Sequence, residues 1–445
     1  MKKIFYFVAL AAAVLFSSCS KDAEKSIVNE VANAGLRISF TLPTDATKAD
    51  VAGVGNENVI TDISVFIYDL SGNEVVGNGT KIPIADFTKN GNNYTSTDAS
   101  LVKTSAGNRK VYLAANVPSG FTAPLTETSL KLREIDIANT NPTSFVMFSP
   151  VVGLPVQGQI QGETAAANAN KNVVDTDFKR ITSKVVVSTT NTNLLLEQNF
   201  TNHSVAGIKI TYTFDKWDTY QNARSVYAIE GTQTTGKRYP FQDAALGYNI
   251  NVNGTVTGNW AQATPKYIGE NIPGNELKGE ATYALLRAKA VPSHKATASG
   301  AVVSWATASV SDWANGFVLV IDPDKKAYFC TDVTAANAVA NAVGGESYTF
   351  PGSYVYFRVM LNEADDAKIL RNQLIHVNVT GIVKDIFAGN PGQGPDGEKP
   401  TNPTEPQQPN PLDPDEPVVL KDAYLKIDVT VKDWLYKDVD VELKP

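Results

Sequence analysis

Residues 35–43, GLRISFTLP, set the fold class of this chain. Every second side chain in this segment is apolar: Leu36, Ile38, Phe40 and Leu42. The positions between them are polar: Arg37, Ser39 and Thr41. Successive side chains of a strand point to opposite faces, so the segment predicts a β-strand that covers a hydrophobic core with one face.

The end of the chain carries the same alternation. In residues 423–434, AYLKIDVTVKDW, the apolar positions are Leu425, Ile427, Val429 and Val431, and a second alternation follows in Val439, Val441 and Leu443. Both ends therefore have the spacing of a core-covering strand, and either could fill the same groove. Two hypotheses stay open on pattern alone. The tail fills a groove that the first strand has left, or the first strand stays and the tail pairs within its own chain.

Period-two alternation recurs through the body of the chain, for example in DISVFIYD (62–69) and GIKITYTF (207–214). Turn clusters rich in Gly and Asn separate these segments. The few helical patterns predict short helices over 129–137 and 335–343. Many short strands with few crossover helices favour antiparallel β-sandwiches. We therefore predict an all-β chain.

Composition shifts divide the chain into segments. Polar stretches near 190–204 predict a boundary between two sandwich domains, 49–196 and 197–390. Nine of the 23 prolines fall in 391–417, a segment that has almost no apolar residue and predicts an extended spacer. The β pattern resumes in 418–445. An isolated strand pair is marginal in water, so this end must pair with something.

The first residues predict an export signal. Two lysines precede an apolar run over 4–16, and the small residues Ser17 and Ser18 follow, which is typical of a secretory signal peptide over 1–18. Phe16-Ser17-Ser18-Cys19 resembles the bacterial lipobox, in which the cysteine becomes the lipidated first residue. Acyl chains such as palmitate would hold the protein on a membrane. The alternative is a signal peptide with a chance cysteine at its end.

The loop after the first strand predicts a cleavage site. Residues 43–58, PTDATKADVAGVGNEN, are polar and contain glycine, with Lys48-Ala49 near the middle. Exposed loops of this kind are where proteases cut. A cut after Lys48 would release 19–48, which carries Cys19 and the first strand. The vacated groove would offer apolar side chains and unpaired backbone groups to another chain's strand. Burying four such side chains is worth at most about 6–12 kcal/mol.

Residue chemistry argues against catalysis and nucleic-acid binding. The chain has 445 residues, a formal net charge of −7 and no basic block, so clustered phosphate contacts are not expected. Its three histidines lie far apart and match no metal-binding motif, so no metal, cofactor or catalytic residue is predicted. Asp322-Pro323-Asp324 is interpreted as a turn and Cys330 as a buried thiol. The tryptophans could line a glycan site, but a sandwich core is their commoner place.

Five segments, in order along the chain, resemble one protein family. They are GNRKVYLAANVPSG (107–120), RITSKVVVS (180–188), YIGENIPGNELKGEATYALLRAKAVP (267–292), ILRNQLIHVNVTGI (369–382) and VTVKDWLYKDVDVEL (429–443). Together they resemble the lipoprotein-type (type V) fimbrillins, the major fimbrial subunits of anaerobic Gram-negative bacteria, and especially their Mfa-like branch.

The resemblance implies two β-sandwich domains of the transthyretin-like, Greek-key type. It also implies export as a lipoprotein anchored to the outer membrane, with Cys19 lipidated. A trypsin-like protease then removes the N-terminal strand, and the C-terminal strand of another subunit fills the groove. The matching positions are Lys48-Ala49 for cleavage and the strands of 418–445 for donation. One departure is that the best-known members are cut after arginine, whereas this loop offers lysine, and Arg37 lies inside the strand itself.

We therefore predict a structural subunit of a fimbrial shaft on the cell surface with a role in adhesion. Its expected partners are other copies of itself, accessory fimbrial subunits, the maturation protease and, in the precursor, the outer membrane. One alternative is an accessory or tip subunit that acts as an adhesin. Another is a surface glycan-binding lipoprotein that keeps its N-terminus and never polymerises.

Overall fold

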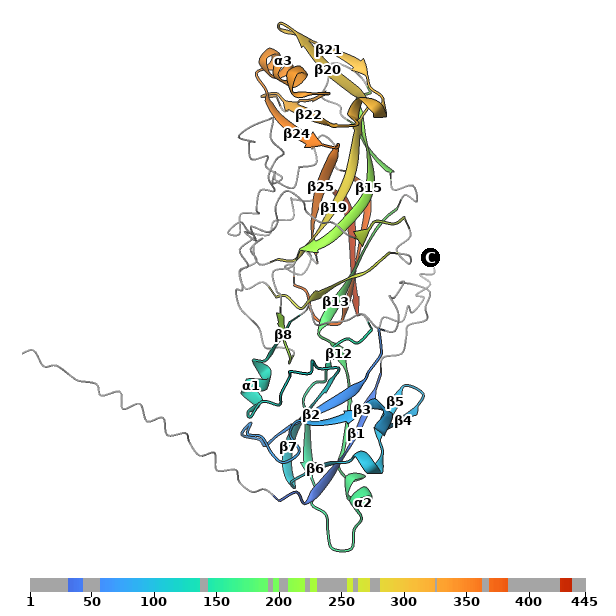
Figure 1. Ribbon diagram of the computed structural model, residues 1–445, viewed down its shortest axis with the longest axis vertical. Coiled ribbons are helices and arrows are strands. Elements are labelled where there is room, and N and C mark those ends of the chain that lie inside the picture. The colour runs from blue at the N-terminus through green and yellow to red at the C-terminus, as the bar shows by residue number, and fades with distance from the viewer. Residues whose placement is uncertain are drawn as a thin grey trace, which may run out of the picture.

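The computed structural model is built almost entirely from β-strands, which confirms the all-β prediction (Figure 1). It describes residues 31–42, 57–136, 143–190, 195–199, 207–220, 225–229, 254–258, 263–272, 281–324, 326–361, 368–382 and 425–433. Strands β1–β12 gather at one end of the long molecule and most later strands at the other (Figure 1). We call these the first and second units. Within the described residues, no helix is long and apolar enough to cross a membrane.

The first unit is a sandwich of two sheets. One sheet has the order β11-β1-β5-β4, with β6 also beside β1. Its strands are β1 (Ala34–Thr41), β4 (Phe87–Asn90), β5 (Asn93–Ser96), β6 (Val102–Thr104) and β11 (Val173–Asp177). The other sheet has the order β12-β9-β7-β2-β3, with β10 on β7. Its strands are β2 (Asp62–Tyr68), β3 (Thr80–Pro83), β7 (Gly107–Ala115), β9 (Met147–Phe148), β10 (Val152–Val156) and β12 (Lys179–Arg180).

Apolar side chains from both sheets form the core of the first unit. Leu36 and Ile38 of β1 pack in one cluster with Val65 of β2 and Leu113 of β7. The alternation predicted for 62–69 is seen, but the other face of β2 is buried as well. That face packs against α1 (Glu127–Lys131), β8 (Glu134–Asp136) and β16 (Ser225–Tyr227). A second layer thus covers the outside of this sheet.

The second unit also contains facing sheets. One has the order β18-β13-β26-β27, with β13 (Thr182–Thr189), β18 (Lys266–Gly269), β26 (Gln373–Ile382) and β27 (Leu425–Asp433). The facing sheet has the order β14-β15-β19-β25, with β17 on β15. Its strands are β14 (Leu195–Asn199), β15 (Lys209–Tyr220), β17 (Gly254–Thr255), β19 (Tyr283–Pro292) and β25 (Tyr354–Met360).

Smaller elements extend the second unit at its far end (Figure 1). They are β20 (His294–Ser299), β21 (Val302–Thr307), β22 (Gly316–Ile321), β23 (Ala327–Cys330), β24 (Glu346–Pro351) and α3 (Val333–Val343). The short helix α2 (Ala165–Ala169) and the 3-10 turns Ile84–Asp86, Asp98–Ser100 and Val310–Trp313 complete the described elements.

Both expected helices exist, with different limits. In α3 the Asp332 carboxylate accepts the Ala335 N–H at 2.9 Å, and Gly344 ends the helix with φ of 68°. This helix begins two residues before the predicted start. The helix expected over 129–137 ends at Lys131, because residues 134–136 instead pair with β16 as a strand.

The position of β13 bears on the domain boundary. We predicted a boundary after residue 196, which would leave 182–189 in the first domain. In the structure β13 pairs in parallel with β26, and Val185 and Val187 lie in the core of the second unit. Packing therefore favours a boundary between β12 and β13. The sequence could not reveal this, since the partner strand begins almost 200 residues later.

A buried polar network joins the two units. Glu57 Oε1 accepts hydrogen bonds from Lys184 Nζ at 2.8 Å and from Tyr267 Oη at 2.7 Å. Burial lowers the pKa of Lys184, although the Glu57 carboxylate opposes that shift. Arg180 of β12 donates to Asn372 Oδ1 at 3.3 Å, next to the start of β26. Glu57, the first residue of the described segment 57–136, thus ties the first unit to two strands of the second unit.

Glu57→Ala should destabilise the protein strongly. The Lys184 side chain is only 4% exposed, and the substitution removes the carboxylate that pairs with this buried ammonium. We expect a loss of about 3–5 kcal/mol in the free energy of unfolding, measured by chemical denaturation. Glu197→Ala is the matched control, because its ion pair with Lys209 is exposed and should contribute less than about 1 kcal/mol. Equal effects of the two substitutions would contradict this account of the junction.

Candidate functional site

The first strand of the chain is a central strand of its sheet. β1 pairs in parallel with β11 and antiparallel with β5 and β6, so both of its edges are hydrogen-bonded. All three neighbours come later in the chain. The only covalent path from β1 to these neighbours runs through residues 43–56. This segment, with Lys48 and Ala49, lies outside the described residues. Every described interaction between β1 and the rest of the unit is therefore non-covalent.

The apolar face of β1 lies in the core, as the alternation predicted. Leu36, Ile38 and Phe40 are fully buried, and Leu42 is 8% exposed. The Phe40 ring stacks on Tyr94 at 5.1 Å between centroids and meets Phe178 edge-on at 5.1 Å. Aromatic contacts of this kind add to the area that the ring buries. Removal of β1 would open the hydrophobic core of the first unit along its length.

The polar face of β1 is held by one arginine. Arg37 Nη1 donates to the Ser96 carbonyl at 2.6 Å, and Nε donates to Asn170 Oδ1 at 2.7 Å. Nη2 forms an ion pair with Asp98. The Arg37 side chain is only 13% exposed, whereas that of Asp98 is 71% exposed. We call Ser96, Asp98 and Asn170 the Arg37 acceptors; no sequence motif marks them, because they come from three separate segments.

Side-chain amides hold the N-terminal end of β1. Gly35 N–H donates to Asn168 Oδ1 at 2.8 Å, and Asn172 Nδ2 donates to the Gly35 carbonyl at 3.1 Å. Asn168 and Asn172 are fully buried. These bonds pair backbone groups that the neighbouring strands leave open at this end. If β1 left, the side-chain amides of Asn168 and Asn172 would lose their hydrogen bonds to Gly35, which is costly for buried amides.

The described part of the tail forms an edge strand. β27 pairs antiparallel with β26, from Leu425 opposite Ile382 to Asp433 opposite Gln373, with an irregularity between Val379 and Gly381. Among the described strands it has no partner on its other edge. In this structure the first strand is seated and this tail segment pairs within its own chain. The other predicted site residues, Cys19, Val439, Val441 and Leu443, lie outside the described residues.

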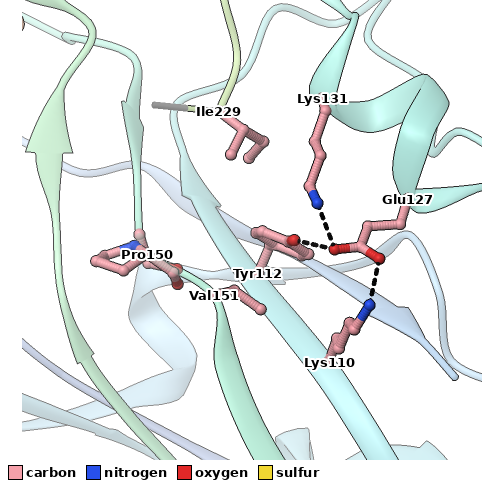
Figure 2. A pocket seen from close by; sticks show the side chains of 8 residues that line it. Lys110, Tyr112, Glu127, Lys131, Pro150, Val151 and Ile229 are labelled. Atoms are coloured by element: carbon pink, nitrogen blue, oxygen red, sulfur yellow. Dashed lines mark hydrogen bonds and ion pairs between the residues drawn. The ribbon is translucent and has the colours of Figure 1, made fainter. Parts of the chain in front are cut away.

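An open cavity of about 540 Å³ lies on the other sheet of the first unit, between β7 and α1 (Figure 2). Glu127 accepts hydrogen bonds from Lys110 Nζ at 2.7 Å and from Tyr112 Oη, and it forms an ion pair with Lys131 at 2.9 Å. Burial favours the neutral carboxylic acid, but these donors outweigh it and lower the pKa of Glu127 to about 2. The charged groups of the cavity thus pair with one another, and the cluster joins α1 to β7.

Two smaller sequence interpretations are confirmed. Asp322 stabilises a turn, because its Oδ1 accepts the Lys326 N–H at 2.8 Å and its Oδ2 accepts the Tyr328 hydroxyl at 3.0 Å. Cys330 is a free, fully buried thiol, and burial raises its pKa to about 12. Trp217 and Trp313 are core residues of the second unit. Within the described residues, no group of three or more His, Cys, Asp or Glu side chains could hold a metal ion.

Comparison with known proteins gives a consistent set of relatives. A family model described as the major fimbrial subunit protein FimA matches residues 36–237. The minor fimbrium tip subunit MfA4 of Porphyromonas gingivalis is 25% identical over 289 residues, which cover 58% of this chain and 82% of MfA4. The minor fimbrium subunit Mfa1 of Porphyromonas gingivalis is 23% identical over 523 aligned positions, covering 99% of each chain.

A solved structure of a fimbrilin, FimA from Porphyromonas gingivalis W83, is 14% identical with a TM-score of 0.43 and covers 91% of this chain and 98% of its own. The family match begins at Leu36, the first fully buried residue of β1, and the Mfa1 match extends over almost the whole chain. Over these segments the chain resembles the fimbrial subunit proteins of the Mfa-like fimbrillin family.

Proposed function

We propose that this protein is a shaft subunit of a fimbrium with a role in adhesion. It is exported with a signal peptide over 1–18 and lipidated at Cys19, which anchors the precursor to the outer membrane. Cleavage between Lys48 and Ala49 then removes 19–48, including β1. The tail of another copy fills the groove, and repetition of this step builds the filament. The observation that carries the proposal is that β1 is a central strand with a buried apolar face, joined covalently to its neighbours only through residues 43–56.

The place of Arg37 supports cleavage at Lys48. A trypsin-like protease needs an accessible, extended segment, and Arg37 is the other basic residue near the first strand. Arg37 lies inside β1, with its N–H bonded to the Asn172 carbonyl at 3.1 Å and its side chain held by the Arg37 acceptors. A cut there would require β1 to unfold first. Lys48 lies six residues beyond the last core residue, Leu42, so a cut there spares the sheet.

The tail supports the donor role. The proposed division of the chain is a first sandwich from 49, a second sandwich to 390, a spacer over 391–417 and donor strands over 418–445. The candidate donor residues are Leu425, Ile427, Val429 and Val431, followed by Val439, Val441 and Leu443. A spacer rich in proline is extended and semi-rigid, so it lets the tail reach across a subunit boundary. Accessory fimbrial subunits are further partners, in keeping with the Mfa1 and MfA4 similarities.

A tip subunit is the second candidate, because one relative, MfA4, is itself a tip subunit. A tip subunit needs a groove but does not need to donate a strand onward. The alternating tail of this chain favours the shaft.

Lys48→Ala should trap the lipidated precursor. The variant keeps β1 in place, so no groove opens and filaments fail to form. N-terminal sequencing and mass measurement of the surface protein check this: wild type should begin at Ala49, and the variant should retain a blocked Cys19. Lys89→Ala is the matched control, since it removes an exposed lysine of β4 and should mature normally. Normal filaments from Lys48→Ala, with residues 19–48 absent, would show that the cut lies elsewhere.

Deleting residues 418–445 should yield subunits that reach the cell surface and remain monomeric. The deletion removes the donor and leaves the groove-forming strands of the first unit unchanged. Gel electrophoresis without boiling should then show no ladder of polymers, and circular dichroism of the purified protein should retain its β signal. A normal ladder from this variant would exclude the tail as donor.

Antibody labelling of surface filaments separates the two candidate positions. Electron microscopy should show this protein along the whole length of each filament. Labelling confined to one end of each filament would instead support the tip subunit.

A further inference from the structure

The cavity between β7 and α1 contains more hydrogen-bond donors than its own residues use. Lys110 Nζ pairs with the Glu127 carboxylate at 2.7 Å and Lys131 Nζ pairs with it at 2.9 Å. Neither lysine has a further partner among the described residues. An ammonium group carries three N–H donors, so each lysine keeps donors that a ligand can take up.

The charges of the cavity do not cancel. The residues that line it include two lysines and one carboxylate, that of Glu127, so one positive charge is in excess. Glu127 stays ionised at neutral pH because its pKa is about 2. Lys110 and Lys131 approach this carboxylate from opposite sides (Figure 2). A second carboxylate on the open side of the cavity would accept hydrogen bonds from both ammonium groups.

The local fold fixes the position of Glu127. The α1 helix begins after Thr126, whose hydroxyl oxygen accepts the Ser129 N–H at 3.1 Å. The Glu127 N–H donates to the Gly72 carbonyl at 2.8 Å, which ties the start of the helix to the turn after β2. Glu127 thus holds both ammonium groups in place before any ligand arrives, and such preorganisation lowers the cost of binding.

The wall of the cavity that faces Glu127 is aliphatic. It consists of Pro150, Val151 and Ile229 (Figure 2). Val151 lies between β9 and β10, and it is 50% exposed. An exposed aliphatic side chain beside a charged group can take an apolar part of a ligand out of water. The cavity therefore presents a cationic side and an aliphatic side to one ligand.

We propose that this cavity binds an acidic peptide segment of a partner protein. The carboxylate of an Asp or Glu side chain bridges Lys110 and Lys131, and a neighbouring aliphatic side chain packs on Val151. This inference rests on the adhesive role in the proposed function and specifies the chemistry of the partner.

The other polar groups of the cavity favour a peptide over an acidic sugar. The hydroxyls of a sugar ring each need hydrogen-bond partners when they leave water. Ser149 Oγ already donates to the Pro150 carbonyl at 2.8 Å and accepts the Leu113 N–H at 2.9 Å. The Tyr112 hydroxyl donates to Glu127, and the aliphatic side offers no hydrogen bonds. One carboxylate beside an aliphatic side chain needs only the two ammonium groups and the aliphatic side.

Peptide binding to the purified full-length protein tests the inference. The probe is fluorescently labelled acetyl-Ala-Leu-Glu-Leu-Ala-amide, and the matched probe has Gln in place of Glu. We expect fluorescence anisotropy to show at least about tenfold tighter binding of the Glu probe, because its hydrogen bonds to the lysines are charge-assisted. Added salt should weaken binding of the Glu probe, since the cavity is open to solvent.

Two exposed positions test the cavity without changing the core. Lys131→Ala removes one ammonium group, and Val151→Asp places a carboxylate on the aliphatic side; each should weaken binding of the Glu probe about tenfold. Lys171→Ala is the control for Lys131, because Lys171 also pairs with a glutamate, Glu163, and is 45% exposed against 43%. Val310→Asp is the control for Val151, because Val310 is 63% exposed and lies in the second unit. Circular dichroism should match wild type in all four variants.

The outcomes separate this inference from the proposed function. Failure of the Glu probe to bind, equal affinity for the two probes, or unchanged binding in both cavity variants would overturn the inference. Binding of N-acetylneuraminic acid that is lost in the same variants, without binding of the Glu probe, would replace the peptide by an acidic sugar. Cavity variants that lose the probe but still form filaments would support a site separate from strand exchange. A wild-type protein that binds the probe but forms no filaments would instead overturn the proposed shaft role.

Discussion

The first unit depends on a central strand, β1, which is the first of the described strands. A central strand pairs its backbone on both edges, and β1 does so with β11 on one side and β5 and β6 on the other. Its apolar face also closes the core between the two sheets of the first unit. Buried amides and apolar side chains both need partners, so loss of such a strand would leave unpaired groups along the whole groove. A second strand in the position of β1 would restore these partners.

The junction between the units limits what a cut in 43–56 can change. Glu57 is held by Lys184 and Tyr267, and the backbone resumes as the first unit directly after it. Lys184 lies on β13 and Tyr267 on β18, and no hydrogen bond among the described residues joins either side chain to β1. Cleavage at Lys48 would thus release the segment before the cut while residue 57 stays fixed. The remaining sheets can keep the spacing that a new strand requires.

The sequence predicted what depends on local pattern. The alternation of 35–43 predicted the strand, its buried face and its place over a core, and the structure confirms these. The spacer predicted over 391–417 lies outside the described residues. The sequence could not predict what depends on distant partners. The Arg37 acceptors come from three separate segments, and β13 joins the second unit only because β26 returns beside it. The parallel pairing of β1 with β11 likewise follows from chain topology, which no local pattern encodes.

The fit of the two competing strands sets the order of events under the proposed exchange. Phe40 contacts three aromatic rings, whereas the candidate donor residues of 418–445 are all aliphatic and would leave part of that space empty. The native strand is also tethered to its groove, which gives it a high effective concentration against a donor from another molecule. Both effects keep β1 seated while the chain is intact. A cut in 43–56 removes the tether without touching the contacts, and the released strand can then diffuse away. The donor's weaker packing is offset because it arrives on a neighbouring subunit, gains a second hydrogen-bonded edge and is itself held there by a covalent spacer. Proteolysis would therefore decide when polymerisation begins, because it cuts the covalent link of β1 to the rest of its chain while the contacts of β1 stay the same.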